Sequence, residues 1–206
     1  MLAFDHVVIA TGNLEDAASR LWDEQGLATM AGGRHPGHGT ANRIAPLGPD
    51  YIELMAVVDR DEAEASPLGR FVAAFVAEGG GLMALCLRTR DITTVTTRLG
   101  IEPLHMTRTR TDGRELSWHI AGLEEALGQQ RLPFFIEWDV AEDDHPGRTV
   151  VEHREEPSGI SWVELAGDKD VIAHRLGDGA PNIRVVPGRP GILAVGIQTR
   201  GGEIRL

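Results

Sequence analysis

Short apolar runs alternate with glycine-rich and proline-rich turns along the first third of the chain. Residues 4–10 form an apolar, β-branched run, and Asn13 follows where it can cap a helix. From Leu14 to Gly26 the apolar residues recur every three or four positions, which predicts a helix with one buried face. Three further strand-like runs follow at 27–31, 40–47 and 51–58. The pattern therefore predicts a βαβββ unit.

The same order of elements returns after a second predicted helix at 68–77 and the glycine triplet 79–81. Laying Asn13 over Asp91 also superposes Arg20-Leu21 on Arg98-Leu99, an offset of 78 residues that indicates internal duplication. The second unit is predicted to contain a helix from Asp91 to Leu99 and strands at 82–87, 103–107, 114–121 and 133–138.

The remaining chain contains a third, incomplete set of elements. A strand is predicted at 159–165, a helix at 168–176, and short β-prone runs at 183–186, 192–197 and 203–206. We therefore expect an α+β fold of tandem βαβββ units that form curved mixed sheets. Residues 1–78 would form the first unit with its extra helix, 79–140 the second, and 141–206 a C-terminal partial unit packed on the same domain.

Composition removes several classes of function. With 31 acidic and 20 basic residues the formal net charge is -11, which would repel a phosphate backbone, so nucleic acid is not an expected partner. No apolar run reaches the length of a membrane span and no leader segment is visible, so we expect a cytoplasmic protein. The single cysteine, Cys86, fits a reducing compartment. Without a phosphate loop or dinucleotide fingerprint, no nucleotide cofactor is expected.

Several sequence segments resemble those of the glyoxalase-like families of the vicinal oxygen chelate superfamily. They are Asp5-His6-Val7-Val8, the loop 33–42 and Tyr51-Ile52-Glu53-Leu54, and similar phrases at 110–114 and 133–138 extend the resemblance through about residue 140. The resemblance implies that each βαβββ unit curls into half of a cup. It also implies that strands facing one another across the cup hold a divalent metal ion.

Three polar side chains interrupt apolar strands in these phrases, namely His6, Glu53 and Glu137. Alternation along a strand predicts that His6 faces the cup together with Phe4 and Val8. Burying an unpaired carboxylate is costly, so each glutamate should have a partner. One imidazole and two carboxylates suit zinc, manganese, iron or nickel. We therefore expect these three residues to bind one divalent metal, with Glu53 or Glu137 as the general base.

The family's further ligand commonly comes from the opening strand of the second unit, and the 78-residue offset places Ala84 there. Alanine cannot bind a metal. Three interpretations follow: a site with three ligands, a fourth ligand from elsewhere such as His119 or His38, or no metal. In the last case His6 would be a buried histidine bonded to a backbone carbonyl or to Asp5.

Candidate substrate contacts come first from the loop at 35–42. If it covers the cup, His38, Thr40 and Asn42 would offer hydrogen bonds to a ligand, although its glycines and prolines are also typical of a surface turn.

The second unit offers further candidates. Arg108 and Arg110 could hold a substrate carboxylate, or form solvated ion pairs. Trp118 and His119 must face opposite sides of their strand, and we expect Trp118 to contact the ligand. His145 follows two aspartates and is interpreted as part of an acidic surface turn.

The leading hypothesis is an enzyme of lyase, isomerase or hydrolase type, metal-assisted or acid/base, that acts on a small oxygen-rich metabolite. The alternative is a protein of the bleomycin-resistance type that binds or sequesters a small molecule without converting it. A third interpretation is an interaction domain whose cup is filled by the C-terminal tail. A homodimer is expected, because edge strands of such half-barrels are usually paired or covered.

Overall fold

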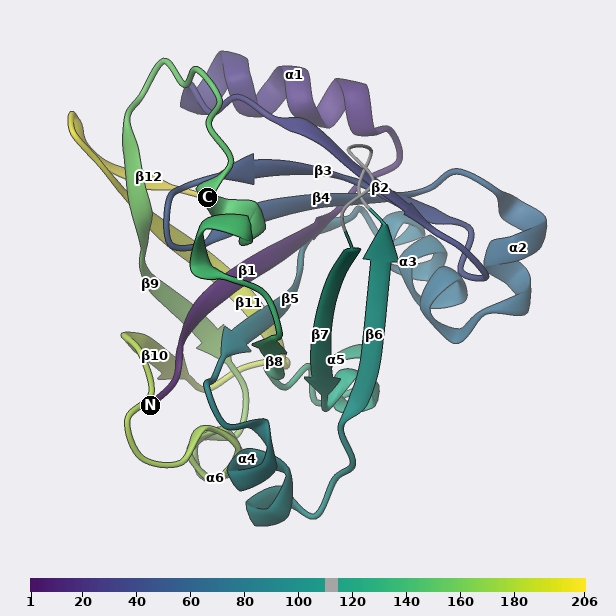
Figure 1. Ribbon diagram of the computed structural model, residues 1–206, viewed down its shortest axis with the longest axis vertical. Helices are drawn as coiled ribbons and strands as arrows, with labels where there is room; N and C mark the ends of the chain where they lie inside the picture. The colour runs from purple at the N-terminus through teal and green to yellow at the C-terminus, as the bar shows by residue number, and fades with distance from the viewer. Residues whose placement is uncertain (110–114) are drawn as a thin grey trace.

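The computed structural model of the chain describes residues 1–109 and 115–206. Within these residues an eight-stranded sheet has the order β2-β3-β4-β1-β5-β8-β7-β6, and a four-stranded sheet has the order β10-β9-β11-β12 (Figure 1). This curled α+β architecture confirms the predicted fold class.

The bounds of the elements are as follows. The strands are β1 Ala3–Ala10, β2 Met30–His35, β3 Thr40–Pro46, β4 Tyr51–Val57, β5 Gly81–Arg88, β6 Leu104–Thr109, β7 Glu115–Ala121, β8 Phe134–Trp138, β9 Pro157–Ala166, β10 Ile183–Val186, β11 Gly191–Thr199 and β12 Gly202–Arg205. The helices are α1 Leu14–Gln25, α2 Arg60–Ala65, α3 Pro67–Ala77, α4 Ile92–Leu99, α5 Leu123–Leu127 and α6 Lys169–Leu176, with short 3-10 turns η1 Glu142–Asp144 and η2 Pro146–Arg148.

The two βαβββ units meet along their opening strands. β1 and β5 pair antiparallel at the centre of the large sheet, while β4 runs parallel to β1 and β8 runs parallel to β5. Each opening strand leads into a helix whose first turn is capped by a side chain, Asn13 for α1 and Asp91 for α4. The 78-residue offset seen in the sequence therefore relates matching elements of the two units.

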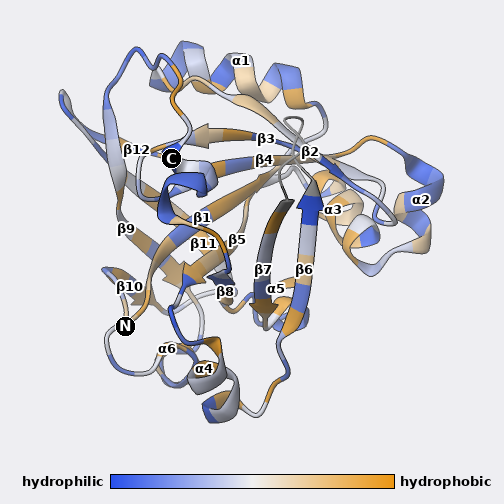
Figure 2. Ribbon diagram, viewed as in Figure 1, coloured by the Kyte–Doolittle hydropathy of each residue, from blue (hydrophilic) through white to orange (hydrophobic). Residues whose placement is uncertain are grey.

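Two hydrophobic clusters cover the two faces of the large sheet. One includes Leu21 of α1, Val95 of α4 and Val163 of β9, so α1, α4 and the small sheet cover the same face. The other includes Val72 of α3 and Ala126 of α5. Figure 2 shows the apolar residues concentrated in the central strands, with polar residues on the helices and loops around them. The candidate site lies on the second of these faces, which we call the inner face.

The inner face is the concave side of the curl, because the edge strands β2 and β6 approach each other there. Arg108 on β6 pairs with Leu116 on β7, so it shares a face with Trp118, which packs in the inner cluster. A Cβ atom added to Gly33 of β2 would lie 3.2 Å from Arg108 Nη1. Among the described residues, no helix has the length and apolar character needed to cross a membrane.

A buried carboxylate, Asp50, joins the C-terminal part to the first unit. It lies in the turn between β3 and β4, and both of its side-chain oxygens lie 3.0 Å from the Ile160 amide of β9, which donates to them. Burial raises the pKa of Asp50 to about 7; the hydrogen bond from Ile160 opposes this rise, and the negative charge of Asp5 adds to it.

The raised pKa predicts that Asp50→Asn stabilises the protein at alkaline pH. The carboxyl group binds its proton more tightly in the folded than in the unfolded chain. Its stabilising contribution to the free energy of unfolding is therefore fully present below about pH 4 and is lost as the pH rises through about 7. Near pH 8 the variant should gain on the order of 2 kcal/mol, because relief of the buried charge exceeds the cost of a buried amide donor without an acceptor. Urea unfolding near pH 8 and pH 5 measures the difference. A gain of equal size at both pH values would contradict the raised pKa.

Candidate functional site

A bulge in β1 turns two consecutive polar side chains to the inner face. The pairing of β1 with β5 shifts register between Phe4 and His6. Phe4 packs in the outer cluster and Val8 in the inner one. The extra residue lets Asp5 and His6 both reach the inner side, which simple alternation forbids. The expectation that His6 shares a face with Phe4 was therefore wrong, whereas its position beside Val8 is as expected.

His6 lies at the bottom of the cup between two carboxylates. Its Nδ1 donates to Asp5 Oδ1 over 2.6 Å, because a carboxylate can only accept. Its Nε2 lies 3.5 Å from Glu53 Oε2. The ring stacks on Tyr51 with centroids 4.6 Å apart and meets the edge of Phe134 at 5.6 Å. The imidazole is thus fixed in orientation and directs Nε2 towards Glu53.

Asp5 is the fully buried centre of a network of donors. Besides His6, it accepts hydrogen bonds from Trp138 Nε1 at 2.9 Å and from His145 Nε2 at 3.0 Å. Burial alone would raise the pKa of Asp5, but the hydrogen bonds and charges of the two histidines outweigh it and hold the pKa well below its usual range. Asp5 therefore stays ionised and orients the His6 ring.

His145 corrects an expectation drawn from the sequence. It was interpreted as part of an acidic surface turn, but its side chain is 2% exposed. The backbone amide of Gly147 donates to His145 Nδ1 over 3.1 Å, so Nε2 carries the proton that goes to Asp5. The η1–η2 segment thus closes one end of the inner face.

Glu53 is held from β3 by Asn42. Glu53 lies on β4 with Tyr51 and Met55 on the inner face, as alternation predicts, and Asn42 Nδ2 donates to Glu53 Oε1 over 2.7 Å. A Cβ atom at Gly32 would lie 2.0 Å from Asn42 Oδ1. Only glycine therefore leaves room for the asparagine that positions Glu53, and Gly32 on β2 is a sequence signal of this arrangement that the apolar pattern does not contain.

Gly32→Ala should displace Asn42 and lower stability by about 2 kcal/mol, since a buried carboxylate would lose its donor. The melting temperature should fall by about 4–8 °C for a chain of this size. Gly12→Ala is the matched control, because a Cβ atom there meets its nearest neighbour at an ordinary 3.6 Å. Differential scanning calorimetry measures both, and equal melting temperatures for the two variants would contradict this role of Gly32.

The far wall of the cup carries a cation and a second histidine. Arg108 lies near His35, whose Nδ1 lies 2.9 Å from Thr40 Oγ1. Burial lowers the pKa of His35; the charge of Glu53 opposes this, and Arg108 adds to it. Arg108 also affects the titration of Tyr51, which is in contact with His6. The charges of Arg108 and Glu53 therefore both act on His35.

The remaining predicted contacts are spread around the cup. His38 Nδ1 lies 2.7 Å from Ser66 Oγ, so the predicted loop packs against the start of α3. Trp118 lies on the inner face with its ring centroid 5.4 Å from that of Trp138. Arg110 lies outside the described residues. His119 faces the outer side, opposite to Trp118, and is therefore not a further ligand for the cup.

Glu137 does not join His6 and Glu53, which corrects the predicted ligand set. On β8 the inner cluster takes Ile136 and Trp138, so Glu137 projects from the other face together with Phe135. Its Oε2 accepts a hydrogen bond of 2.9 Å from the Ile92 amide at the start of α4. Glu137 caps a helix rather than lining the cup.

The second unit supplies no metal ligand at the positions that match the first. The offset of 78 relates His6 to Ala84 and Val8 to Cys86. Because Glu53 pairs with Val8 and Phe134 with Cys86, Phe134 is the counterpart of Glu53. Both matching positions are apolar.

The other nearby groups do not complete a metal site. Candidate ligand atoms of Asp5, His6 and Cys86 do lie within 4.8 Å of one another. However, Asp5 already accepts from three donors, and burial raises the pKa of the Cys86 thiol well above its ordinary value. Among the described residues of this cluster, only His6 and Glu53 remain, where catalytic zinc sites use three protein ligands. These residues do not fit the metal that the family resemblance implies.

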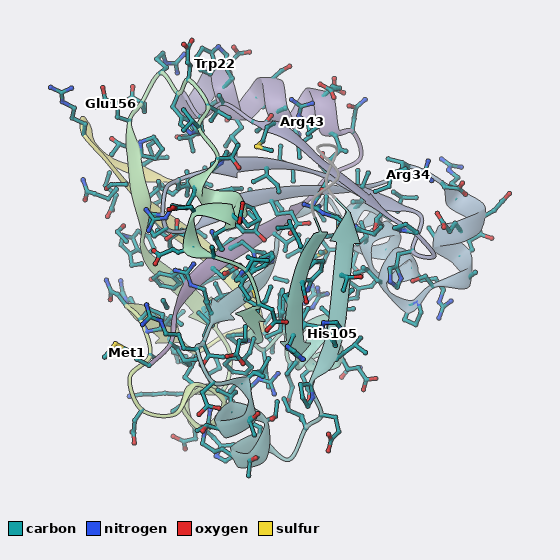
Figure 3. All side chains as sticks on the ribbon, in the orientation of Figure 1. Met1, Trp22, Arg34, Arg43, His105 and Glu156 are labelled. Atoms are coloured by element: carbon teal, nitrogen blue, oxygen red, sulfur yellow. The ribbon has the colours of Figure 1, made fainter. Side chains whose placement is uncertain are left out.

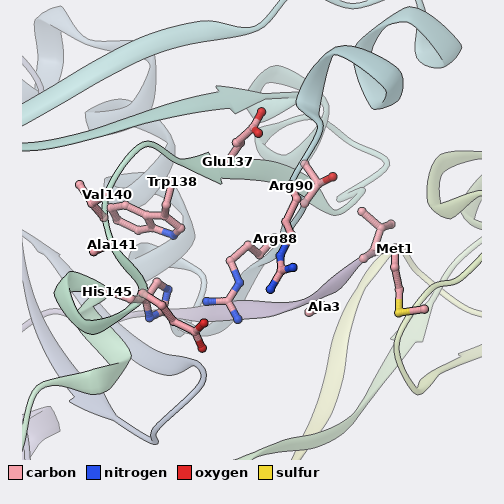
Figure 4. A pocket seen from close by; sticks show the side chains of 12 residues that line it. Met1, Ala3, Arg88, Arg90, Glu137, Trp138, Val140, Ala141 and His145 are labelled. Carbon is pink, nitrogen blue, oxygen red and sulfur yellow. The ribbon is translucent and has the colours of Figure 1, made fainter.

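A cavity of about 640 Å³ borders the Asp5 network on its other side. Trp138 and His145, which both donate to Asp5, line it together with Arg88 and Arg90. Figure 4 shows the two guanidinium groups extending into its centre. Glu137 and Glu142 also line the cavity, so its wall carries charges of both signs.

Comparisons with known proteins agree with this architecture. A family model described as a glyoxalase-like domain matches residues 4–178. A hypothetical protein from Staphylococcus aureus superposes with a TM-score of 0.71 at 18% identity, covering 100% of this chain and 98% of that one. Methylmalonyl-CoA epimerase from Mycobacterium tuberculosis gives a TM-score of 0.47 at 21% identity, covering 67% of this chain and 87% of its own. The search of curated proteins finds no match. Since the family model spans most of the chain, this protein belongs to the glyoxalase-like domain family.

Proposed function

We propose that this protein is an acid/base enzyme that moves a proton on a small oxygen-rich molecule, with His6 and Glu53 as the reacting pair. One observation carries the proposal. His6 Nδ1 donates to Asp5, so a neutral His6 would present the lone pair of Nε2 to the Glu53 carboxylate, 3.5 Å away. Two acceptors facing each other are stable only with a proton or another donor between them. The pair is therefore built to hold and exchange one proton.

The surrounding residues support abstraction of a proton next to a carbonyl group. Glu53 would take the proton from carbon, and the negative charge that develops on the carbonyl oxygen would be stabilised by protonated His6. The proton returns from Glu53 to carbon, so the protein regains its starting state. Arg108 carries the charge needed to hold a carboxylate of the substrate from the opposite wall. No step of this proposal uses a metal.

Hydrogen exchange in D₂O tests the proposal without knowledge of the natural reaction. The wild-type protein is incubated with a panel of 2-oxo, 2-hydroxy and 2-alkyl-substituted carboxylic acids, and loss of the proton signal next to the carbonyl group is followed by ¹H NMR. Protein-dependent exchange in at least one class of compound supports proton transfer. Compounds that raise the melting temperature but never exchange would contradict it.

The cavity favours a second candidate function, the binding of an anionic small molecule without turnover. Its volume of about 640 Å³ is within the range of small-molecule sites, and Arg88 and Arg90, beside Glu137 and Glu142, offer guanidinium groups to an anion. If this alternative holds, Arg88→Gln should abolish the thermal shift given by the same carboxylic acids, whereas Arg108→Gln should leave it unchanged.

A further inference from the structure

The outer face of the β6–β7 hairpin brings two histidines and one aspartate together. His105 and His119 lie directly opposite each other across the antiparallel pair, with ring centroids 4.9 Å apart. Asp139 directly follows β8, and its backbone amide donates to the Ser117 carbonyl over 2.9 Å, which fixes it beside β7. Figure 3 shows His105 next to these strands. Three strands therefore each deliver one metal-binding side chain to the same place.

The distances between the donor atoms match those around a single ion. His119 Nδ1 lies 3.1 Å and His105 Nε2 lies 4.0 Å from Asp139 Oδ2, and all three donor atoms lie within 4.8 Å of one another. Ligands bound to zinc at about 2.0–2.2 Å stand roughly 3–4 Å apart. A small rotation of the exposed His105 ring is enough to close the site.

Ser117 bonds two of the three donors. Its Oγ lies 2.9 Å from His105 Nε2 and donates to Asp139 Oδ2 over 3.2 Å. This bridge keeps the imidazole and the carboxylate turned towards each other before any ion binds. Because Ser117 bonds the same two atoms that would bind the ion, these hydrogen bonds are exchanged for metal bonds when the ion enters.

The electrostatics and exposure of the cluster also suit a cation. Glu137 lies opposite His119 across β7 and β8, so a further carboxylate lies on the same face. The side chains of His105, His119 and Asp139 are 54%, 36% and 36% exposed. An ion held here would keep open positions for water or an added ligand.

We propose that His105, His119 and Asp139 form a binding site for a divalent cation of the zinc type, separate from the cup. Two imidazole nitrogens and one carboxylate oxygen form a ligand set that favours zinc, cobalt or nickel over magnesium or calcium. The ion would tie β6, β7 and the end of β8 together. Nothing in the proposal depends on the proton transfer assigned to His6 and Glu53.

Isothermal titration of the untagged protein with ZnCl₂ tests the site. The wild-type chain should bind one equivalent. His105→Ala and Asp139→Asn should each weaken binding by about 100-fold or more, because each removes a direct ligand. His174→Ala, which removes an exposed histidine outside the cluster, should bind as the wild type does.

Imidazole NMR provides a second readout that does not depend on affinity. Zinc should shift the ring resonances of His105 and His119 and leave those of His6 unchanged. A zinc-induced shift of the His6 ring resonances without one at His105 and His119 would overturn the proposal, because it would place the ion in the cup. Wild-type affinity in both His105→Ala and Asp139→Asn, or no binding by the wild-type chain, would overturn it as well.

Discussion

Glu53→Gln is expected to slow deuterium exchange into the substrate by about 10²–10⁴-fold, the usual contribution of a positioned general base. Glutamine fills the same space and can keep one oxygen for the Asn42 amide, so the fold should not change. The substituted side chain cannot accept the proton, and it ends the sharing of a proton with His6 Nε2. ¹H NMR exchange rates at saturating substrate, with the melting temperature measured in parallel, separate catalysis from stability.

Glu137→Gln is the matched control, since the sequence pattern predicted both glutamates as catalytic and the structure places them on opposite faces. It should leave exchange within about twofold of wild type and cost only the modest stability of a helix cap, about 1 kcal/mol. Rapid exchange in Glu53→Gln combined with slow exchange in Glu137→Gln would refute the assignment of the base.

Asp5→Asn is expected to lower the free energy of unfolding at neutral pH by about 3–5 kcal/mol, because it breaks a buried charged network from one side. An amide offers one acceptor and adds two donors, whereas His6, Trp138 and His145 all require acceptors. The melting temperature should fall by about 6–20 °C. Urea unfolding gives the free energy directly.

The stability lost in Asp5→Asn should change with pH in a definite direction, which a simple packing defect would not do. The folded pKa of Asp5 is depressed, so its contribution is present above the unfolded pKa of about 4 and is lost as the pH falls towards the folded value. The deficit of Asp5→Asn relative to wild type should therefore shrink below about pH 4. Asp23→Asn, an exposed control, should stay within about 0.5 kcal/mol throughout. A deficit that is constant with pH would contradict the network.

The sequence pattern was sufficient to predict the repeated βαβββ order, because apolar periodicity and caps such as Asn13 and Asp91 are local signals. It also predicted the inner position of Glu53 from simple alternation. It could not predict the bulge at Asp5, since an inserted residue in a strand reverses the facing of everything before it. Asp5 was considered only as a structural partner of His6, and its bonds to Trp138 and His145 depend on the folded chain.

The error at Glu137 has a related cause. Glu137 was matched to Glu53 because the segments Phe-Ile-Glu-Trp and Tyr-Ile-Glu-Leu are similar. Strand pairing instead makes Phe134 the counterpart of Glu53. The loop before β8 differs in length from that before β4, and a shift of three residues changes both the position along the strand and the face. The spacing of residues in one sequence does not reveal where such an insertion lies.

The separation between Asp5 and His145 has a consequence for how the chain is made. The two residues are 140 positions apart in the sequence. During synthesis, Asp5 therefore cannot accept the hydrogen bond from His145 until most of the polypeptide has left the ribosome. A nascent first half would have to bury this charge without its final partner. Folding of the amino-terminal half should therefore be delayed until the distal segment arrives, and fragments that stop short of it should be prone to aggregation.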